Sequence, residues 1–122
     1  MISTSPEETK KIAEKIAAKV KNGGTILLYG DLGSGKTTFA KGIAGAMGIK
    51  EFSVKSPTYT YIRELGNKKA KLYHIDLYRL ESIDELLQEE ILELITKKRN
   101  IVVIEWADKL FLNIKDGIKI FL

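Results

Sequence analysis

The sequence predicts an α/β fold in which helices flank a mostly parallel central β-sheet. Three observations support this prediction. Two short apolar runs, at residues 25–29 and 101–104, have the continuous apolarity of strands that are buried on both faces. Segments with apolar residues at helical spacing stand before and between these runs. Two further strand-like segments meet at a short turn, which adds a β-hairpin insertion to the α/β pattern.

The first half of the chain is predicted to fold as helix, strand and helix. A capping box at residues 5–8, with Pro6 at the first helical position, starts the first helix, and residues 22–24 (Asn-Gly-Gly) end it. A strand follows over residues 25–29. The second helix ends near Gly48. Its apolar positions are Phe39, Ala40, Ile43, Ala44 and Met47.

The middle of the chain is predicted to hold an exposed loop and the β-hairpin. Residues 51–58 read as the loop, in which Pro57 fixes a turn. The strand-like residues 59–65 and 70–76 flank a polar turn at residues 66–69, which is the pattern of a hairpin.

A third helix, a buried strand and a short final strand complete the predicted fold. A second capping box, residues 82–85, starts the helix, and the basic residues 97–99 complement its dipole at the other end. The buried strand at residues 101–104 leads directly into Glu105. The final strand covers residues 118–122.

Residues 30–37, Gly-Asp-Leu-Gly-Ser-Gly-Lys-Thr, match the whole phosphate-binding P-loop pattern. A predicted strand precedes the pattern and a predicted helix follows it, which is the context that the pattern requires. The glycines let successive amide groups point at phosphate oxygens, and the helix adds the positive end of its dipole. We therefore expect a nucleoside triphosphate site on a three-layer fold of the P-loop NTPase type. The expected nucleotide-binding residues here are Asp31, Leu32, Gly33, Ser34, Gly35, Lys36, Thr37 and Thr38.

Three residues have expected roles around the phosphates. Lys36 would bridge the β- and γ-phosphates, which makes it a catalytic residue, and the Thr37 hydroxyl would ligate Mg²⁺. Such sites take a second metal ligand from the end of a neighbouring strand, where parallel sheets bind their ligands. Glu105 has this position and could hold Mg²⁺ directly or through a water. The alternative for Glu105 is a plain surface glutamate after a core strand.

Asp76 also ends a predicted strand, and its carboxylate could polarise an attacking water or a substrate hydroxyl. A structural role, such as pairing with Arg79 or capping a turn, fits the spacing nearly as well. His74 is the only histidine, and the chain has no cysteine to join it in a metal site. We therefore expect His74 to be a packed or hydrogen-bonded core residue.

Residues 56–60 (Ser-Pro-Thr-Tyr-Thr) and Trp106 each have two open interpretations. A hydroxyl in the first segment could reach the γ-phosphate or Mg²⁺ and be released after hydrolysis, as switch loops are. The same segment would suit an ordinary turn that enters a strand. Trp106 is either an anchor for a base or a partner, or a core residue.

Composition predicts one domain, residues 1–122, that is long enough to bury a hydrophobic core. Apolar residues make up 44% and charged residues 30%, which is ordinary for a soluble globular protein. We find no apolar stretch long enough to span a membrane and no signal-peptide pattern in residues 1–8. The absence of cysteine excludes disulfides and thiolate metal sites. We expect a cytoplasmic protein with no membrane contact.

The net charge of +4 is unevenly distributed. Residues 1–61 carry nine lysines and arginines against five acids, whereas residues 62–122 carry eleven of each. The basic excess therefore lies in the half that holds the phosphate site. It could favour nucleotide or RNA phosphates, although lysines scattered over a helix are more often a solvated face.

Four segments occur in a specific order and spacing. They are Gly-Asp-Leu-Gly-Ser-Gly-Lys-Thr-Thr at 30–38, Ser-Pro-Thr-Tyr-Thr at 56–60, Tyr-His-Ile-Asp-Leu-Tyr-Arg-Leu at 73–80 and Ile-Glu-Trp-Ala at 104–107. Together they resemble the TsaE family, bacterial P-loop ATPases of tRNA threonylcarbamoyladenosine biosynthesis. The first segment is shared by many proteins, whereas the combination is specific and covers nearly the whole chain.

The resemblance implies an ATPase that uses ATP and Mg²⁺ and is stimulated by a TsaB–TsaD protein complex. That complex transfers a threonylcarbamoyl group to the adenosine beside the anticodon of ANN-decoding tRNAs. ATP hydrolysis by the TsaE subunit supports repeated turnover and does not perform the transfer itself. The tRNA is expected to be held mainly by the partner, since the sequence shows no aromatic-basic platform for RNA.

Matching positions carry the family's functional residues onto this chain. The P-loop lysine and threonine keep the roles given above, and Glu105 serves Mg²⁺. Thr58 resembles the family's switch-loop hydroxyl, and Asp76 resembles its functionally required acid. Trp106 matches a tryptophan beside the nucleotide. The family usually continues beyond the point that corresponds to Leu122, so contacts made by such a tail are not carried over.

Two other functions stay open at this point. A small-molecule kinase shares the P-loop, but kinases need a water-excluding lid that usually supplies arginines. Between Asp76 and Ile101 the sequence has an acidic amphipathic helix and no arginine-rich lid. A non-hydrolysing adaptor would bind ATP only to order residues 56–60 for docking. For the ATPase we expect slow hydrolysis by the chain alone, with Arg79 or a partner residue as the source of any arginine at the γ-phosphate.

Overall fold

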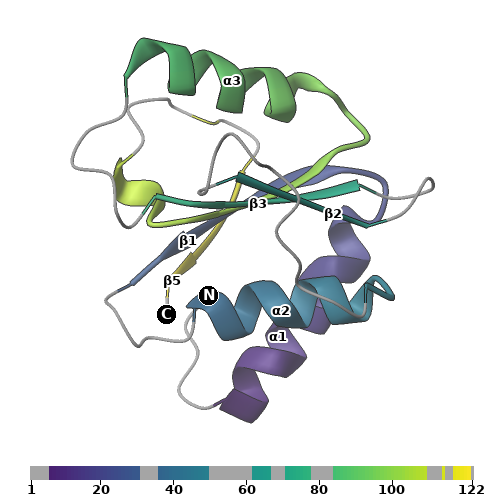
Figure 1. Cartoon of the computed structure of the whole chain (residues 1–122). Coiled ribbons are helices and arrows are strands. Elements are labelled where there is room, and N and C mark those ends of the chain that lie inside the picture. The colour runs from purple at the N-terminus through teal and green to yellow at the C-terminus, as the bar shows by residue number, and fades with distance from the viewer. Residues whose placement is uncertain are drawn as a thin grey trace.

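The computed structural model describes residues 6–30, 36–49, 62–66, 71–77, 84–109, 114 and 117–121. Within these residues five strands form one sheet in the order β2-β3-β4-β1-β5 (Figure 1). The strands are β1 (Gly24–Tyr29), β2 (Ile62–Gly66), β3 (Lys71–Asp76), β4 (Ile101–Glu105) and β5 (Ile118–Phe121). β3, β4, β1 and β5 run parallel, and β2 pairs antiparallel with β3. The predicted mostly parallel sheet with a β-hairpin is confirmed.

Helices cover both faces of this sheet. The helices are α1 (Pro6–Val20), α2 (Lys36–Ala46), α3 (Glu85–Thr96) and the short 3-10 helix η1 (Ala107–Lys109). α1 and α2 lie on one face and α3 lies on the other, so the chain forms three layers as predicted (Figure 1). No helix in the described part of the chain is long and apolar enough to cross a membrane.

The layer between the sheet and the first two helices is the larger core, here called the α1–α2 cluster. Phe39 is its largest member and is fully buried, and burying a side chain of this size contributes about 1.5–3 kcal/mol. The helices form because their apolar residues recur at helical spacing and cover the sheet. The cluster contains Ile12, Ala13, Ile16, Ala17, Val20, Ile26, Leu28, Phe39, Ala40, Ile43, Ala44, Leu72, Ile101, Val103 and Ile120.

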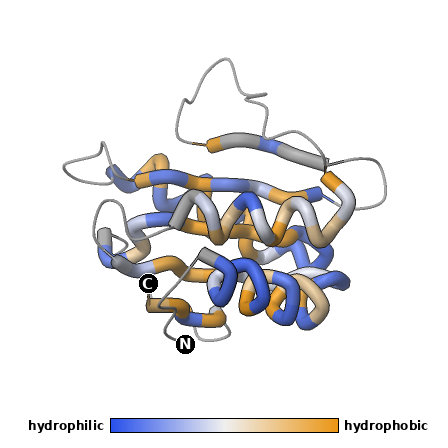
Figure 2. The backbone as a smooth tube through the Cα atoms, turned by 90° about the horizontal axis from the view of Figure 1, so that it is seen from below, coloured by the Kyte–Doolittle hydropathy of each residue, from blue (hydrophilic) through white to orange (hydrophobic). Residues whose placement is uncertain are grey.

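The layer between the sheet and α3 is a second core, here called the α3 cluster. Because side chains alternate along a strand, each buried strand supplies residues to both clusters. β4, for example, gives Val102 and Ile104 to the α3 cluster and its other apolar residues to the α1–α2 cluster. Figure 2 shows apolar residues concentrated on the strands, and mixed polar and apolar residues along the helices. The α3 cluster contains Leu27, Ile62, Ile75, Leu77, Leu87, Ile91, Val102, Ile104 and Ala107.

The turn between α1 and β1 requires glycine because the backbone passes very close to a neighbouring segment. Gly23 has φ of 120°, and a Cβ added there would lie 1.6 Å from the carbonyl oxygen of Lys98. The amide of Gly24 donates a hydrogen bond to the carbonyl of Asn100, at 3.0 Å. This contact fixes the start of β1 beside the start of β4.

The predicted element boundaries differ from the structure by one residue at the start of β1 and at the end of β4, and also at the start of α3 and in the hairpin. The capping box at residues 82–85 predicted Ser82 as the N-cap of α3, but the N-cap is Asp84, whose carboxylate accepts a hydrogen bond from the amide of Leu87 at 2.8 Å. Aspartate is as favourable as serine at this position, so a second capping candidate lay inside the predicted box. In the hairpin, Gly66 belongs to β2 and not to the turn.

Candidate functional site

The carboxyl ends of three parallel strands meet at one edge of the sheet. Glu105, the last residue of β4, lies beside Leu28 of β1 and beside Asp76, the last residue of β3. Gly30 follows β1 directly with φ of 147°, a conformation that residues with side chains rarely adopt. Because the P-loop pattern begins at Gly30, it starts at the same edge as the two predicted carboxylates.

The P-loop pattern ends in the first turn of α2, which begins at Lys36. The predicted strand before the pattern and helix after it are therefore both present. Thr38, in this first turn, is exposed. The nucleotide contacts themselves stay predictions. Some of the predicted nucleotide-binding residues lie outside the described part of the chain: Asp31, Leu32, Gly33, Ser34, Gly35 and Thr58, together with the side chains of Lys36 and Thr37.

The acidic residues at this edge face the layer that contains α2. Along β3, Leu72 belongs to the α1–α2 cluster. Side chains two residues apart share a face of a strand, so His74 and Asp76 face the same layer. Val103 places Glu105 on that face by the same alternation. Strand register therefore gathers these polar side chains on the side of the sheet where the P-loop helix packs.

Glu105 and His74 form a buried pair. Nε2 of His74 hydrogen bonds to Oε2 of Glu105, and both residues are only 2% exposed. The alternative that Glu105 is a plain surface residue is therefore excluded. The expectation that His74 is a hydrogen-bonded core residue is confirmed, and its partner is the residue predicted to serve the metal. No local sequence pattern indicates this contact, because it joins positions 31 residues apart.

Asp76 is half-buried beside this pair. Its strand partner across the ladder is Glu105, and neighbouring strands are about 4.8 Å apart. The amide of Leu77 donates a hydrogen bond to the carbonyl of Glu105, at 3.3 Å, which extends the ladder past the last residues of both strands. Two carboxylates on adjacent strands and on one face repel each other, so a cation bound at this edge would be stabilised. The proposed pairing of Asp76 with Arg79 lies outside the described residues.

The donor groups at the edge fit Mg²⁺ bound together with a nucleotide. Mg²⁺ prefers oxygen ligands and usually keeps several waters, with one or two protein groups and substrate phosphates completing its shell. In the residues that the structure describes, no group of three or more histidine, aspartate or glutamate side chains could hold a metal. A self-contained protein cage is therefore absent there. The carboxylate of Glu105 is an oxygen ligand of the type that a phosphate-bound Mg²⁺ takes, and its partnership with the Thr37 hydroxyl stays a prediction.

Trp106 follows Glu105 with an unusual backbone conformation. Its φ is 60°, in the left-handed region that bulky residues seldom occupy and that often marks functional sites. The half-buried indole packs against the α3 cluster. Sequence reasoning left open whether Trp106 is a core residue or an anchor. The structure shows the partial core role, and its position beside the nucleotide stays a prediction.

A tyrosine at the same edge was not singled out by the sequence. The ring of Tyr29, the last residue of β1, stacks on Phe121 of β5 with centroids 5.0 Å apart and ring planes at 17°. Phe121 is 50% exposed, so this aromatic pair reaches the surface. Burial, and then the nearby carboxylate of Asp108, raise the pKa of the Tyr29 phenol. Only the pairing of β1 with β5 brings these residues together, and that strand order is not visible in the sequence.

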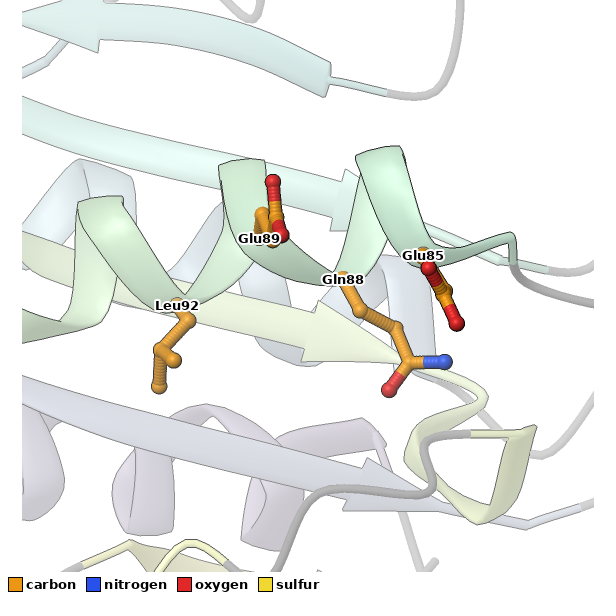
Figure 3. Close-up of a pocket in the computed structure, with 4 residues that line it drawn as sticks. All are labelled: Glu85, Gln88, Glu89 and Leu92. Atoms are coloured by element: carbon orange, nitrogen blue, oxygen red, sulfur yellow. The ribbon is translucent and has the colours of Figure 1, made fainter.

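A hollow of about 190 Å³ lies on the outer layer formed by α3. Its lining residues, Glu85, Gln88, Glu89 and Leu92, all come from α3 (Figure 3). α3 covers the face of the sheet opposite to the one that the Glu105 side chain faces. The hollow contains none of the predicted site residues, so the site is defined by the sheet edge and not by this hollow.

Comparison with known proteins connects this geometry to a family. A family model described as "Threonylcarbamoyl adenosine biosynthesis protein TsaE" matches residues 3–121. The tRNA threonylcarbamoyladenosine biosynthesis protein TsaE of Bacillus subtilis is 44% identical over 105 residues, which cover 86% of this chain and 64% of that protein. The protein of the same name from Aquifex aeolicus is 45% identical over 112 residues, which cover 89% of this chain and 77% of that protein.

A solved structure agrees with this match. The crystal structure of YdiB from Bacillus subtilis is similar with a TM-score of 0.61 and 38% sequence identity, and the match covers 87% of this chain and 62% of that one. The chain thus spans slightly less than two thirds of the Bacillus proteins it matches. The family model, the identities and the shared P-loop-type fold together show that the chain belongs to the TsaE family.

Proposed function

We propose that this chain is a Mg²⁺-dependent ATPase that supports N6-threonylcarbamoylation of the adenosine beside the anticodon in ANN-decoding tRNAs. Its membership of the TsaE family supports the pathway, and the complete P-loop pattern at residues 30–37 supports the use of ATP. The activity would be cytoplasmic. In this proposal a TsaB–TsaD complex stimulates hydrolysis and holds most of the tRNA.

One observation carries the catalytic part of the proposal. Glu105 is a buried carboxylate at the carboxyl end of β4, next to Asp76 and on the face of the sheet that α2 covers. A buried carboxylate is costly unless hydrogen bonds or a cation stabilise it. Its place at the edge where the P-loop begins is the place of the second metal carboxylate in P-loop enzymes.

Each residue has a separate task in this proposal. Lys36 would neutralise the β- and γ-phosphate oxygens, and the hydroxyl of Thr37 and the carboxylate of Glu105 would hold Mg²⁺. Bound Mg²⁺ would neutralise the charge that develops on the phosphates. Asp76 would orient the attacking water and accept its proton. Thr58 would act as the switch-loop hydroxyl that senses the γ-phosphate.

The position of Arg99, one of three arginines in the chain, supports a source of the arginine elsewhere. Arg99 lies in the turn that precedes β4, whereas Glu105 ends that strand, so Arg99 lies at the opposite edge of the sheet. An arginine that stabilises the transferred phosphoryl group accelerates such reactions about 10³–10⁵-fold. The candidates are Arg79, outside the described residues, and a residue of the partner. We therefore propose that hydrolysis by the isolated chain is slow.

Phosphate release from ATP tests this function. The chain is assayed alone and with a TsaB–TsaD pair and tRNA, and Lys36→Ala is the inactive control. Slow release alone and clear stimulation in the complex would support the gated ATPase. Negligible release under both conditions, with ATP still bound, would reduce the chain to a nucleotide-dependent adaptor. Transfer of phosphate to a small acceptor would instead favour a kinase.

A further inference from the structure

His74 lies on the strand next to that of Glu105, diagonally across from it. β3 and β4 are adjacent and parallel, and the register pairs His74 with Val103 and Asp76 with Glu105. His74 is therefore the diagonal neighbour of Glu105, on the same face and two residues closer to the interior of the sheet. In this position the imidazole contacts the carboxylate on the side that faces the core.

The contact takes place without access to bulk water. His74 and Glu105 are each 2% exposed, and Nε2 of His74 donates a hydrogen bond to Oε2 of Glu105. A buried hydrogen bond to a carboxylate is strong and directional. Because the imidazole ring is rigid and its nitrogen has a fixed direction, the bond restricts the rotation of the carboxylate about its side-chain torsions.

Packing alone would not require histidine here. His74 faces the same layer as Leu72, which belongs to the α1–α2 cluster, and an apolar side chain would satisfy that layer. An imidazole differs from an apolar side chain by its hydrogen-bonding nitrogens. One of these nitrogens meets the carboxylate at the edge of the site.

We propose that His74 is a positioning residue for Glu105, which holds the carboxylate in the orientation that receives nucleotide-bound Mg²⁺. The inference rests on the proposed role of Glu105 and adds a residue to it. Hydrogen-bond partners of metal-binding carboxylates orient them, and loss of such a partner typically lowers metal affinity or activity 10–100-fold. His74 is not proposed to touch the metal or the nucleotide.

The alternative hypothesis, that His74 has a purely structural role, predicts a different result. If the pair only satisfies two buried polar groups, changes at His74 lower the stability of the fold and leave ligand binding unchanged once the chain is folded. If His74 positions Glu105, the change appears in the dependence of nucleotide binding on Mg²⁺. The informative quantity is thus the ratio of ATP affinities measured with Mg²⁺ and with EDTA, here called the Mg²⁺ coupling.

The experiment compares three substitutions at this position by calorimetric titration of ATP at a temperature where each variant is folded. His74→Leu removes the donor, and we expect the Mg²⁺ coupling to fall about 10–100-fold while the affinity in EDTA stays within about threefold. His74→Gln places an amide nitrogen close to the position of Nε2 and should keep most of the coupling. His74→Asn is polar but too short to reach, and it should resemble His74→Leu. Ile75→Val, on the opposite face of β3, is the packing control and should leave the coupling unchanged.

A double-mutant cycle with Glu105→Gln completes the test. If His74 acts through Glu105, His74→Leu has no further effect on the coupling in the Glu105→Gln background. Additive losses would overturn the proposal, and so would full coupling in both His74→Leu and His74→Asn. If His74→Leu does not fold, the Mg²⁺ couplings of His74→Gln and His74→Asn are compared instead, and equal couplings in these two variants would overturn the proposal. A wild-type chain that binds no ATP would overturn the proposed function itself, which is a distinguishable result.

Discussion

Replacement of Glu105 by glutamine distinguishes the contribution of this residue to the stability of the fold from its proposed role in Mg²⁺-dependent hydrolysis. Glutamine keeps the volume of glutamate and an oxygen that accepts the hydrogen bond from His74, but it removes the charge. Because Glu105 is only 2% exposed, the effect on folding is set by this hydrogen bond and by desolvation. A hydrogen bond to a charged group contributes about 1.5–3 kcal/mol and a neutral one about 0.5–1.5 kcal/mol.

The two terms nearly cancel in Glu105→Gln. The weaker hydrogen bond costs about 1 kcal/mol, while an amide is less costly to bury than a carboxylate. We expect the free energy of unfolding to change by no more than about 1 kcal/mol, or about 4 °C in Tm for a domain of this size. Glu105→Ala, by contrast, leaves the buried imidazole without this acceptor and should cost about 1–3 kcal/mol.

The assay measures urea unfolding and phosphate release on the same samples. We expect Glu105→Gln to remain folded, to bind nucleotide and to release phosphate at least about 100-fold more slowly, the usual cost of one lost transition-state contact. Glu93→Gln, the same change at an exposed position on α3, is the matched control and should alter neither quantity. A wild-type rate in Glu105→Gln would refute the metal role of Glu105. Equal destabilisation by glutamine and alanine would show that the buried charge itself supports the fold.

Four further predictions follow from the same site. Lys36→Ala should weaken ATP binding at least about 100-fold by calorimetry, since one charge-assisted phosphate contact contributes about 3 kcal/mol. The control Lys41→Ala, at an exposed position on the same helix, should leave the affinity unchanged. Equal ATP affinities in the two variants would refute the assignment of the P-loop. Asp76→Ala should retain nucleotide and lose turnover, and full turnover would show that its role is structural. ATP should change the fluorescence of Trp106, and an unaltered spectrum would place the indole away from the nucleotide. Because the folded state raises the pKa of Tyr29, unfolding free energy should fall as pH rises above the unfolded value of about 10, and Tyr29→Phe should reduce that slope.

The fold was largely predictable because its signals are local. The apolar runs that became β1 and β4 and the helical spacing of α1 and α2 each lie within one short segment. The P-loop pattern is local as well, so the strand before it and the helix after it could be placed from sequence. The start of α3 was placed wrongly because Ser82 and Asp84 are both good N-caps. Sequence spacing does not decide between them, whereas the hydrogen bond of Asp84 to Leu87 does.

The site was less predictable because its contacts depend on strand order. Glu105 and Asp76 could be nominated separately as acids at strand ends. That they are direct neighbours follows only from the adjacency of β3 and β4. The same adjacency makes His74 the hydrogen-bond partner of Glu105, although in the sequence it is an isolated histidine. The pairing of β1 with β5 likewise allows the ring of Tyr29 to stack on Phe121. The left-handed backbone of Trp106 had no sequence signal at all.

The register of β3 links the hydrophobic core to the proposed chemistry. Leu72 packs into the α1–α2 cluster, while Ile75 and Leu77 pack into the α3 cluster. A slip of one residue would exchange these faces and expose the wrong side chains to each core, so packing specifies the register strongly. The same slip would move His74 and Asp76 to the face covered by α3, away from Glu105. The apolar residues of β3 therefore hold His74 and Asp76 on the face of the sheet that Glu105 also occupies, so the packing that specifies the register also sets the geometry of the site.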